Sequence, residues 1–146
     1  MAESITLLSQ IKEKFQCGPV DVRTYSPLTL AYIGDAIFDL VIRTVVVERA
    51  NRPANQLHKE SVKYVKAETQ AQMIDALMPL FTEEELSVYR RGKNAKPYTK
   101  AKNASFAEYH KATGFEAVMG YLYLQDDMPR ILELIHQGIL AIGMEL

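Results

Sequence analysis

Apolar residues recur along this chain every three or four positions, which is the spacing of one face of an α-helix. The first such series is Ile5, Leu8, Ile11 and Phe15, and it predicts an amphipathic helix that ends near Cys17-Gly18-Pro19. We find no segment with a convincing alternation of apolar and polar residues, so the pattern predicts no β-strand.

A long apolar helix is predicted next. Ser26 has the character of a helix N-cap, and Pro27 suits the first helical position. The run Val45-Val46-Val47 would suit a strand, but its spacing continues the helical face. The break at Asn51-Arg52-Pro53 is then expected to start a further helix from about Pro53 to Met78. The apolar positions of the long helix are Ile33, Ile37, Leu40, Val41 and Val45.

Start signals mark three helices in the second half of the chain. Thr82 to Glu85 and Ser105 to Glu108 both have the spacing of a capping box, and Asp126 or Asp127 is expected to cap the last helix. We therefore predict an all-α fold, with residues 1–146 forming a single domain. The last two helices should bury the apolar residues Phe115, Val118, Met119, Leu122, Tyr123, Ile131, Leu134, Ile135 and Ile139.

The composition agrees with a globular domain and excludes several classes of protein. With 48% hydrophobic and 24% charged residues in 146, the chain can bury a core and is not expected to be disordered. Its longest apolar runs span four residues, against about 18 for a membrane span. The N-terminus shows no secretory signal, and the single cysteine, Cys17, allows neither an intrachain disulfide nor a cysteine zinc site. We expect a cytoplasmic location.

Charge is distributed unevenly, although the net charge is only −1. The segment 86–107 holds six of the 17 basic residues and none of the 18 acidic ones. We interpret this segment as a phosphate-binding surface for a nucleic acid, the alternative being a solvated loop whose lysines confer solubility. The candidate RNA-binding residues are Arg90, Arg91, Lys93, Asn94, Lys96, Lys100 and Lys102.

Two acidic residues in apolar helices are candidate catalytic residues. Asp35 has Tyr32 and Phe38 three residues away on its face, and Gly34 beside it costs about 1 kcal/mol of helix propensity relative to alanine. Such a glycine suggests close approach of another backbone. Glu116 repeats the situation, between Gly114 and Gly120. Together the two acids outline a carboxylate site for Mg²⁺ beside a phosphate-binding surface.

Other chemistry has little support. The chain has no P-loop and no G-x-G-x-x-G motif, which excludes the usual nucleotide-binding loops. His58, His110 and His136 are widely separated and show no metal-ligand spacing, so we interpret each as a surface histidine or one with a structural partner, the alternative being a histidine acid–base pair for RNA cleavage. Cys17, near a helix end, is expected to be a structural thiol.

At these residues the chain resembles the ribonuclease III family. Tyr32-Ile33-Gly34-Asp35-Ala36 is similar to the end of the signature E-R-L-E-F-L-G-D-A, and Phe115 to Gly120 is similar to the second motif, D-T-V-E-A-L-I-G. The resemblance covers residues 20–140 approximately, with no double-stranded-RNA-binding domain. That absence, and the sequences at 91–96 and 112–117, resemble the Mini-ribonuclease III branch.

The resemblance implies a ribonuclease III-type endonuclease domain that cleaves double-stranded RNA with Mg²⁺, or Mn²⁺ in its place, to give 5′-phosphate and 3′-hydroxyl ends. In this interpretation Asp35 and Glu116 are the catalytic and metal-binding residues. The expected substrate is the precursor of large-subunit (23S) ribosomal RNA, with a ribosomal protein as a further partner. The resemblance also implies a homodimer with Tyr32 at its interface, the alternative being a tyrosine in the core of its own subunit.

The chain departs from the family pattern at three acidic positions. Leu28, Ala31 and Thr113 stand where longer enzymes have acids, so two of four usual carboxylates remain. One metal ion, or a second one recruited only with substrate, then becomes plausible. Asp39 matches no family acid, and a surface ion pair explains it equally well. The departures also motivate an alternative function, a non-catalytic RNA- or ribosome-binding helical dimer with a decayed nuclease site; a purely structural dimer would leave the basic segment unexplained.

Overall fold

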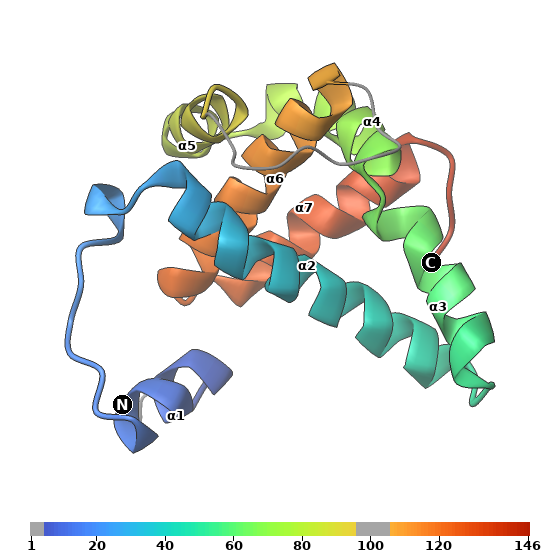
Figure 1. The fold of residues 1–146 in the computed structure, drawn as a ribbon, viewed down its shortest axis with the longest axis horizontal. Coiled ribbons are helices and arrows are strands. Elements are labelled where there is room, and N and C mark those ends of the chain that lie inside the picture. The colour runs from blue at the N-terminus through green and yellow to red at the C-terminus, as the bar shows by residue number, and fades with distance from the viewer. Residues whose placement is uncertain (1–4, 96–105) are drawn as a thin grey trace.

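The computed structural model describes residues 5–95 and 106–146, and all the regular structure in these ranges is helical (Figure 1). This confirms the predicted all-α fold. Within the described ranges no helix is long and apolar enough to cross a lipid bilayer. The helices are α1 (Leu7–Lys14), α2 (Pro27–Arg49), α3 (Ala54–Val65), α4 (Ala67–Leu77), α5 (Glu83–Lys93), α6 (Phe106–Leu124) and α7 (Met128–Ala141), with 3-10 turns at Val22–Thr24 and Met78–Leu80.

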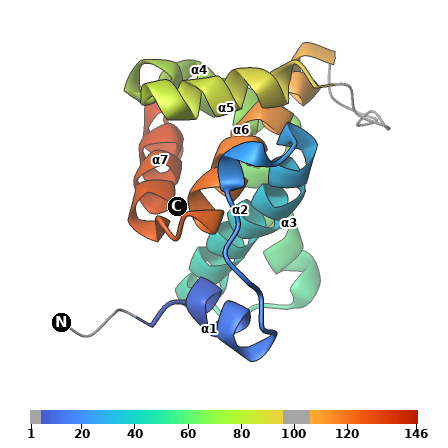
Figure 2. The ribbon, with the colours of Figure 1, turned by 90° about the vertical axis from the view of Figure 1, so that its left-hand side faces the viewer.

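Helix α6 forms the centre of the molecule, because α2, α4, α5 and α7 all pack against it. Its side chains Phe115, Ala117, Val118 and Met119 are completely buried. The predicted buried residues of α7, including Ile131 and Leu134, complete the same core. Helix α1 is different: none of its residues is fully buried, and it lies at the opposite end of the molecule from α5 (Figure 2).

The side chains predicted to cap helices form capping hydrogen bonds in the structure. Ser26 accepts a hydrogen bond from the Thr29 backbone N–H, and Thr82 and Glu85 form a reciprocal capping box. Asp127, the second of the two candidates, caps α7 by accepting from the Arg130 backbone N–H. Ser105 lies outside the described residues. These caps explain why α2, α5 and α7 begin where they do.

The prediction of one helix from Pro53 to Met78 is wrong, because Lys66 has an extended backbone (φ −67°, ψ 152°) and separates α3 from α4. Two side chains stabilise this break. The Thr69 hydroxyl donates to the Lys63 carbonyl (2.6 Å), and the Gln70 amide donates to the Val65 carbonyl (2.8 Å). They satisfy carbonyl groups that the backbone N–H groups of a continuous helix would otherwise bond. The apolar spacing alone could not reveal this exchange.

Helices α2 and α6 cross in backbone contact at two glycines. A β-carbon on Gly34 would lie 1.7 Å from the Glu116 backbone oxygen, and one on Gly120 would lie 1.9 Å from the Leu30 backbone oxygen. No residue with a side chain fits at either position without moving a backbone. The close approach predicted from Gly34 is therefore confirmed, and it sets the spacing of the two helices that carry the candidate acids.

Candidate active site

Asp35 and Glu116 lie together where α2 and α6 cross. Their carboxyl groups are close enough to form a hydrogen bond with each other. Asp35 is exposed to solvent, whereas Glu116 is only partly exposed. The burial that the sequence suggested for Asp35 is therefore not observed, although Phe38, three residues later on α2, is in the core. Of the two acids, Glu116 is the less exposed.

The environment of Glu116 strongly favours its protonated form. Burial raises the pKa of this carboxyl to about 9, and both a hydrogen bond with Asp35 and the negative charge of Asp35 act in the same direction. The nearby Gln70 amide acts in the opposite direction and lowers the pKa of the Glu116 carboxyl. At neutral pH the pair thus holds a proton that a cation can replace.

The donor atoms at this site suit a hard divalent cation. Two carboxylates from different helices can bind Mg²⁺, which prefers oxygen ligands and retains several of its waters. Among the described residues no group of three or more acidic, histidine or cysteine side chains is arranged so that it could hold a metal ion. At two of the three departure positions the side chain is buried: Ala31, and Thr113, whose hydroxyl donates to the Tyr109 carbonyl. Asp35 and Glu116 are therefore the residues that would hold the ion, with water completing its shell.

Asp39 does not belong to this site in the observed arrangement. Its carboxylate forms an ion pair with Arg43, with an N–O distance of 2.9 Å, one turn further along α2. Of the two explanations that the sequence left open for Asp39, the observed contact favours the surface ion pair. His110 likewise has a structural partner, since its Nδ1 lies 2.8 Å from the Lys93 carbonyl oxygen at the end of α5.

The last turn of α5 forms an exposed basic surface next to α6. Arg90, Arg91, Lys93 and Asn94 are all exposed, whereas Gly92 packs so closely on α6 that a β-carbon there would lie 2.8 Å from the Ala117 β-carbon. Because Ala117 follows Glu116 in sequence, this basic turn lies beside the α6 turn that carries the acid. Of the other predicted RNA-binding residues, Lys96, Lys100 and Lys102 lie outside the described residues.

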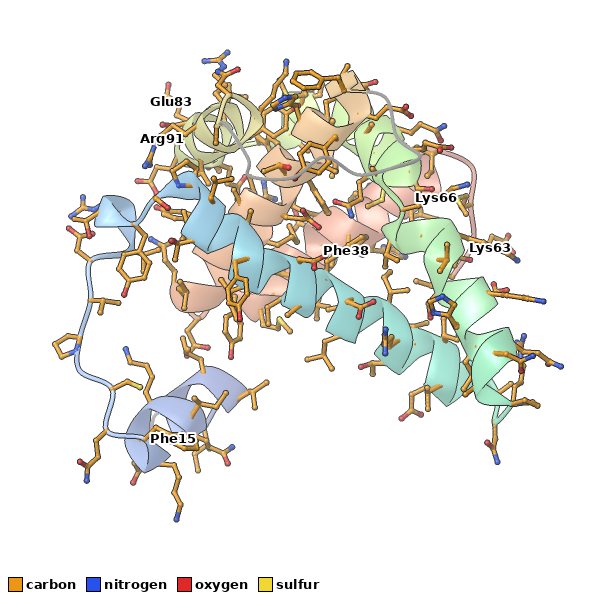
Figure 3. All side chains as sticks on the ribbon, in the orientation of Figure 1. Phe15, Phe38, Lys63, Lys66, Glu83 and Arg91 are labelled. Atoms are coloured by element: carbon orange, nitrogen blue, oxygen red, sulfur yellow. The ribbon has the colours of Figure 1, made fainter. Side chains whose placement is uncertain are left out.

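Arg91 also has a structural contact. Its guanidinium donates to the Tyr25 carbonyl (3.2 Å), which connects α5 to the segment just before α2. Figure 3 shows Arg91 at this junction, between α5 and the start of α2. The contact uses one of the guanidinium N–H donors, and the side chain remains exposed.

Tyr32 is 82% exposed on α2, three residues before Asp35. This exposure contradicts the alternative that Tyr32 is a core residue of its own subunit. Leu40 and Val47 are further exposed apolar residues on the same helix. The position of Tyr32 at a subunit interface remains a prediction.

Gln70 is a site residue that the sequence analysis missed. It is 2% exposed on α4 and lies near enough to Glu116 to influence the pKa of that carboxyl. Its position depends on the break at Lys66, which the apolar spacing did not reveal, so no signal in the single sequence could have identified it.

Comparisons with known proteins identify the family of this chain. The ribonuclease III domain family matches residues 28–127. The chain is 46% identical over 121 residues to a Mini-ribonuclease 3 from Thermoanaerobacter sp. (strain X514), covering 83% of this chain and 85% of that one. It is 42% identical over 124 residues to a Mini-ribonuclease 3 from Staphylococcus aureus, covering 84% of this chain and 92% of that one.

A solved structure shows the same fold. The crystal structure of a protein from Fusobacterium nucleatum superposes with a TM-score of 0.74 at 30% identity, covering 84% of this chain and 98% of the other. With a family match over most of the chain and relatives above 40% identity, the chain belongs to the ribonuclease III family and is an endoribonuclease of its Mini-ribonuclease 3 branch.

Proposed function

We propose that the protein cleaves double-stranded RNA at the Asp35–Glu116 pair in a Mg²⁺-dependent reaction, with Mn²⁺ as an alternative ion. The observation that carries this proposal is the meeting of the two carboxyl groups from α2 and α6 beside the basic end of α5. This arrangement combines a cation site with a surface for the phosphates that the cation would act on.

Each carboxylate has a distinct role in this mechanism. Asp35, which is exposed, faces the side from which RNA arrives. Glu116 would hold a cation as its carboxylate, and for this it would first release the proton that its environment favours. A bound Mg²⁺ supplies Lewis-acid chemistry, lowering the pKa of a bound water and neutralising charge on the scissile phosphate. Attack by water in line with the leaving group then gives 5′-phosphate and 3′-hydroxyl ends.

The exposed cations of α5 are proposed to hold the RNA backbone. A-form RNA is recognised through its phosphates and 2′-hydroxyls, because its deep major groove does not admit side chains. Arg90, Lys93 and the N–H groups of Arg91 that do not bond Tyr25 suit phosphate oxygens, and Asn94 suits a 2′-hydroxyl. Lys96, Lys100 and Lys102 extend this set in sequence.

The biological setting follows from the family. We propose a cytoplasmic homodimer with Tyr32 at its two-fold interface, which would direct two sites to opposite strands of one duplex. The expected substrate is precursor of large-subunit (23S) ribosomal RNA, in which a ribosomal protein can present the duplex.

The first experiment incubates a long RNA duplex and a 23S precursor transcript with the protein, in Mg²⁺ or in EDTA, beside the variant Asp35→Asn. Asp39→Asn is the matched control, because Asp39 lies one turn from Asp35 but pairs with Arg43. We expect discrete cleavage that requires Mg²⁺ and Asp35 but not Asp39. Intact RNA that the folded protein nevertheless binds would instead support the non-catalytic RNA-binding function.

A further inference from the structure

The amide of Gln70 has a defined orientation in the core of the molecule. Its Nε2 donates to the Val65 carbonyl at the end of α3, with an N–O distance of 2.8 Å. Only the nitrogen of an amide can donate, so this bond determines which end of the side chain is nitrogen and which is oxygen. The Oε1 atom therefore points away from Val65 and must find its own partner.

Among the described residues, Oε1 of Gln70 has no such partner, although it is buried. A buried carbonyl oxygen without a hydrogen bond costs about 1–3 kcal/mol, and such atoms commonly mark a place for water or an ion. The same amide lies near the Glu116 carboxyl, where it opposes the rise in the pKa of that group. The unsatisfied oxygen thus belongs to a side chain that lies beside one of the two site acids.

Gln70 reaches this position because the helix is interrupted just before it. The chain interrupts a helix at Lys66, and the Gln70 side chain bonds a carbonyl that the Thr69 backbone N–H would bond in a straight helix (Figure 3 labels Lys63 and Lys66 at the break). Places where a chain departs from its local helical pattern are often functional.

We propose that Gln70 is a positioning residue of the active site, orienting the Glu116 carboxylate through Nε2 and accepting a hydrogen bond through Oε1 from the water shell of a divalent cation held by Asp35 and Glu116. Mg²⁺ retains several waters when bound, and residues that orient metal ligands are commonly worth 10–100-fold in metal affinity. This inference rests on the proposed function, because it requires a cation at the carboxylate pair.

The test compares two variants at adjacent positions. Gln70→Met keeps the volume of the side chain but removes both polar atoms. Thr69→Val is the matched control, because it removes the other side-chain hydrogen bond of the same break, to the Lys63 carbonyl, without touching the acids. Binding of Mn²⁺ alone is measured by electron paramagnetic resonance, RNA cleavage is measured as a function of Mg²⁺ concentration, and thermal melting reports folding.

We expect Gln70→Met to weaken Mn²⁺ binding by about 10–100-fold and to raise the Mg²⁺ concentration needed for half-maximal cleavage similarly. Thr69→Val should lower the melting temperature but leave both metal responses unchanged. If Gln70→Met does not fold, Gln70→Asn, whose amide is too short to reach both partners, is expected to show the same loss.

Two results would overturn the inference while leaving the proposed function intact. One is a folded Gln70 variant with the metal responses of the original protein, and the other is an equal loss in Thr69→Val, which would assign the effect to the break alone. An original protein that binds no Mn²⁺ in an Asp35-dependent way and cleaves no RNA would overturn both the inference and the proposed function.

Discussion

Gly34 lies so close to Glu116 that a β-carbon on it would be 1.7 Å from the Glu116 backbone oxygen. The residue next to one site acid is thus in direct contact with the backbone of the other. Because Gly120 makes the reciprocal approach to Leu30, the spacing between the two carboxylates is set by two glycines rather than by side-chain packing.

Adding one methyl group at Gly34 should therefore affect both stability and activity. Overpacking of a tight contact typically costs 1–3 kcal/mol, and because the obstacle here is backbone we expect Gly34→Ala to cost about 3 kcal/mol of unfolding free energy. RNA cleavage should fall more than 10-fold even where the variant is folded, since α2 and α6 must separate. Gly18→Ala is the control, because no atom lies within 4 Å of its β-carbon position, and denaturant melts with cleavage assays on both variants decide the matter.

Glu116 should make the metal-free protein less stable as the pH rises. Its carboxyl has a pKa of about 9 in the folded protein against 4.5 ordinarily, so between these values the folded state binds a proton that the unfolded state has lost. The contribution of Glu116 to the free energy of unfolding is then fully present below about pH 4.5 and is lost as the pH rises toward about 9.

The variant Glu116→Gln, which does not titrate, should remove this dependence and melt at a higher temperature than the original protein at alkaline pH in EDTA. It should also cleave no RNA. Melting curves in EDTA across this pH range test the point, and parallel pH dependences of the two proteins would show that the proton is held elsewhere.

The buried ion pair between Glu85 and Arg130 should make the protein less stable as the pH falls into the acid range. Burial opposes ionisation of Glu85, but hydrogen bonds from Arg130 and from the Thr82 backbone outweigh it and lower the pKa of Glu85. Both Arg130–Glu85 contacts are 2.8 Å, and the Glu85 side chain is only 4% exposed. A lowered pKa means that this stabilisation is present above the unfolded value of 4.5 and is lost as the pH falls through the folded value.

Glu85→Gln should accordingly cost about 3 kcal/mol at neutral pH, the low end for breaking a buried pair, because Arg130 keeps Glu133 and the Leu80 carbonyl as partners. The difference from the original protein should shrink below pH 4.5. Asp39→Asn, in an exposed pair, should cost less than about 1 kcal/mol. Chemical denaturation at neutral and acid pH measures both, and a loss for Glu85→Gln that is independent of pH would exclude the ionic origin.

The basic turn of α5 should control RNA affinity through its charge. Replacing Arg90 and Lys93 by glutamine removes two exposed cations, and the slope of log K against log salt should fall by about 1 for each phosphate that is no longer bound. The melting temperature should change little, because both side chains are exposed. Lys12 and Lys14, in the last turn of α1, are the matched control pair.

Filter binding of a catalytically inactive Asp35→Asn protein at several salt concentrations gives these slopes. Arg91 is left intact in this experiment because its contact with Tyr25 would mix a structural effect with the electrostatic one. A salt slope that does not change in Arg90→Gln/Lys93→Gln would show that the RNA lies elsewhere.

The sequence predicts the helices of this protein better than it predicts their contacts. Ser26, Thr82 and Asp127 act as caps because capping depends on side chains only two or three residues away. The break at Lys66 escaped prediction because Thr69 and Gln70 bond carbonyls of the preceding helix, and helix spacing carries no trace of that exchange.

In the active site, too, local features could be predicted from the sequence, whereas contacts between helices could not. Asp35 and Glu116 could be identified because glycines flank them in apolar helices, but their unequal exposure depends on the angle at which α2 and α6 cross. Gln70 comes from a third helix, α4, and only the packing of α4 against α6 places it at the acids.

Tyr32 offers the clearest test of the proposed dimer. The Tyr32 side chain is 82% exposed, so contact with a second copy of the chain would remove a large apolar surface from water. Tyr32→Ala should therefore raise the dimer dissociation constant at least 10-fold, with little change in helix content. Leu80→Ala removes a 50% exposed apolar side chain from the turn between α4 and α5, and it should leave the dimer unchanged. Analytical ultracentrifugation over a range of protein concentrations separates the two cases. If both variants sediment like the original protein, Tyr32 does not lie at the interface, and duplex cleavage by two facing sites would need another contact surface.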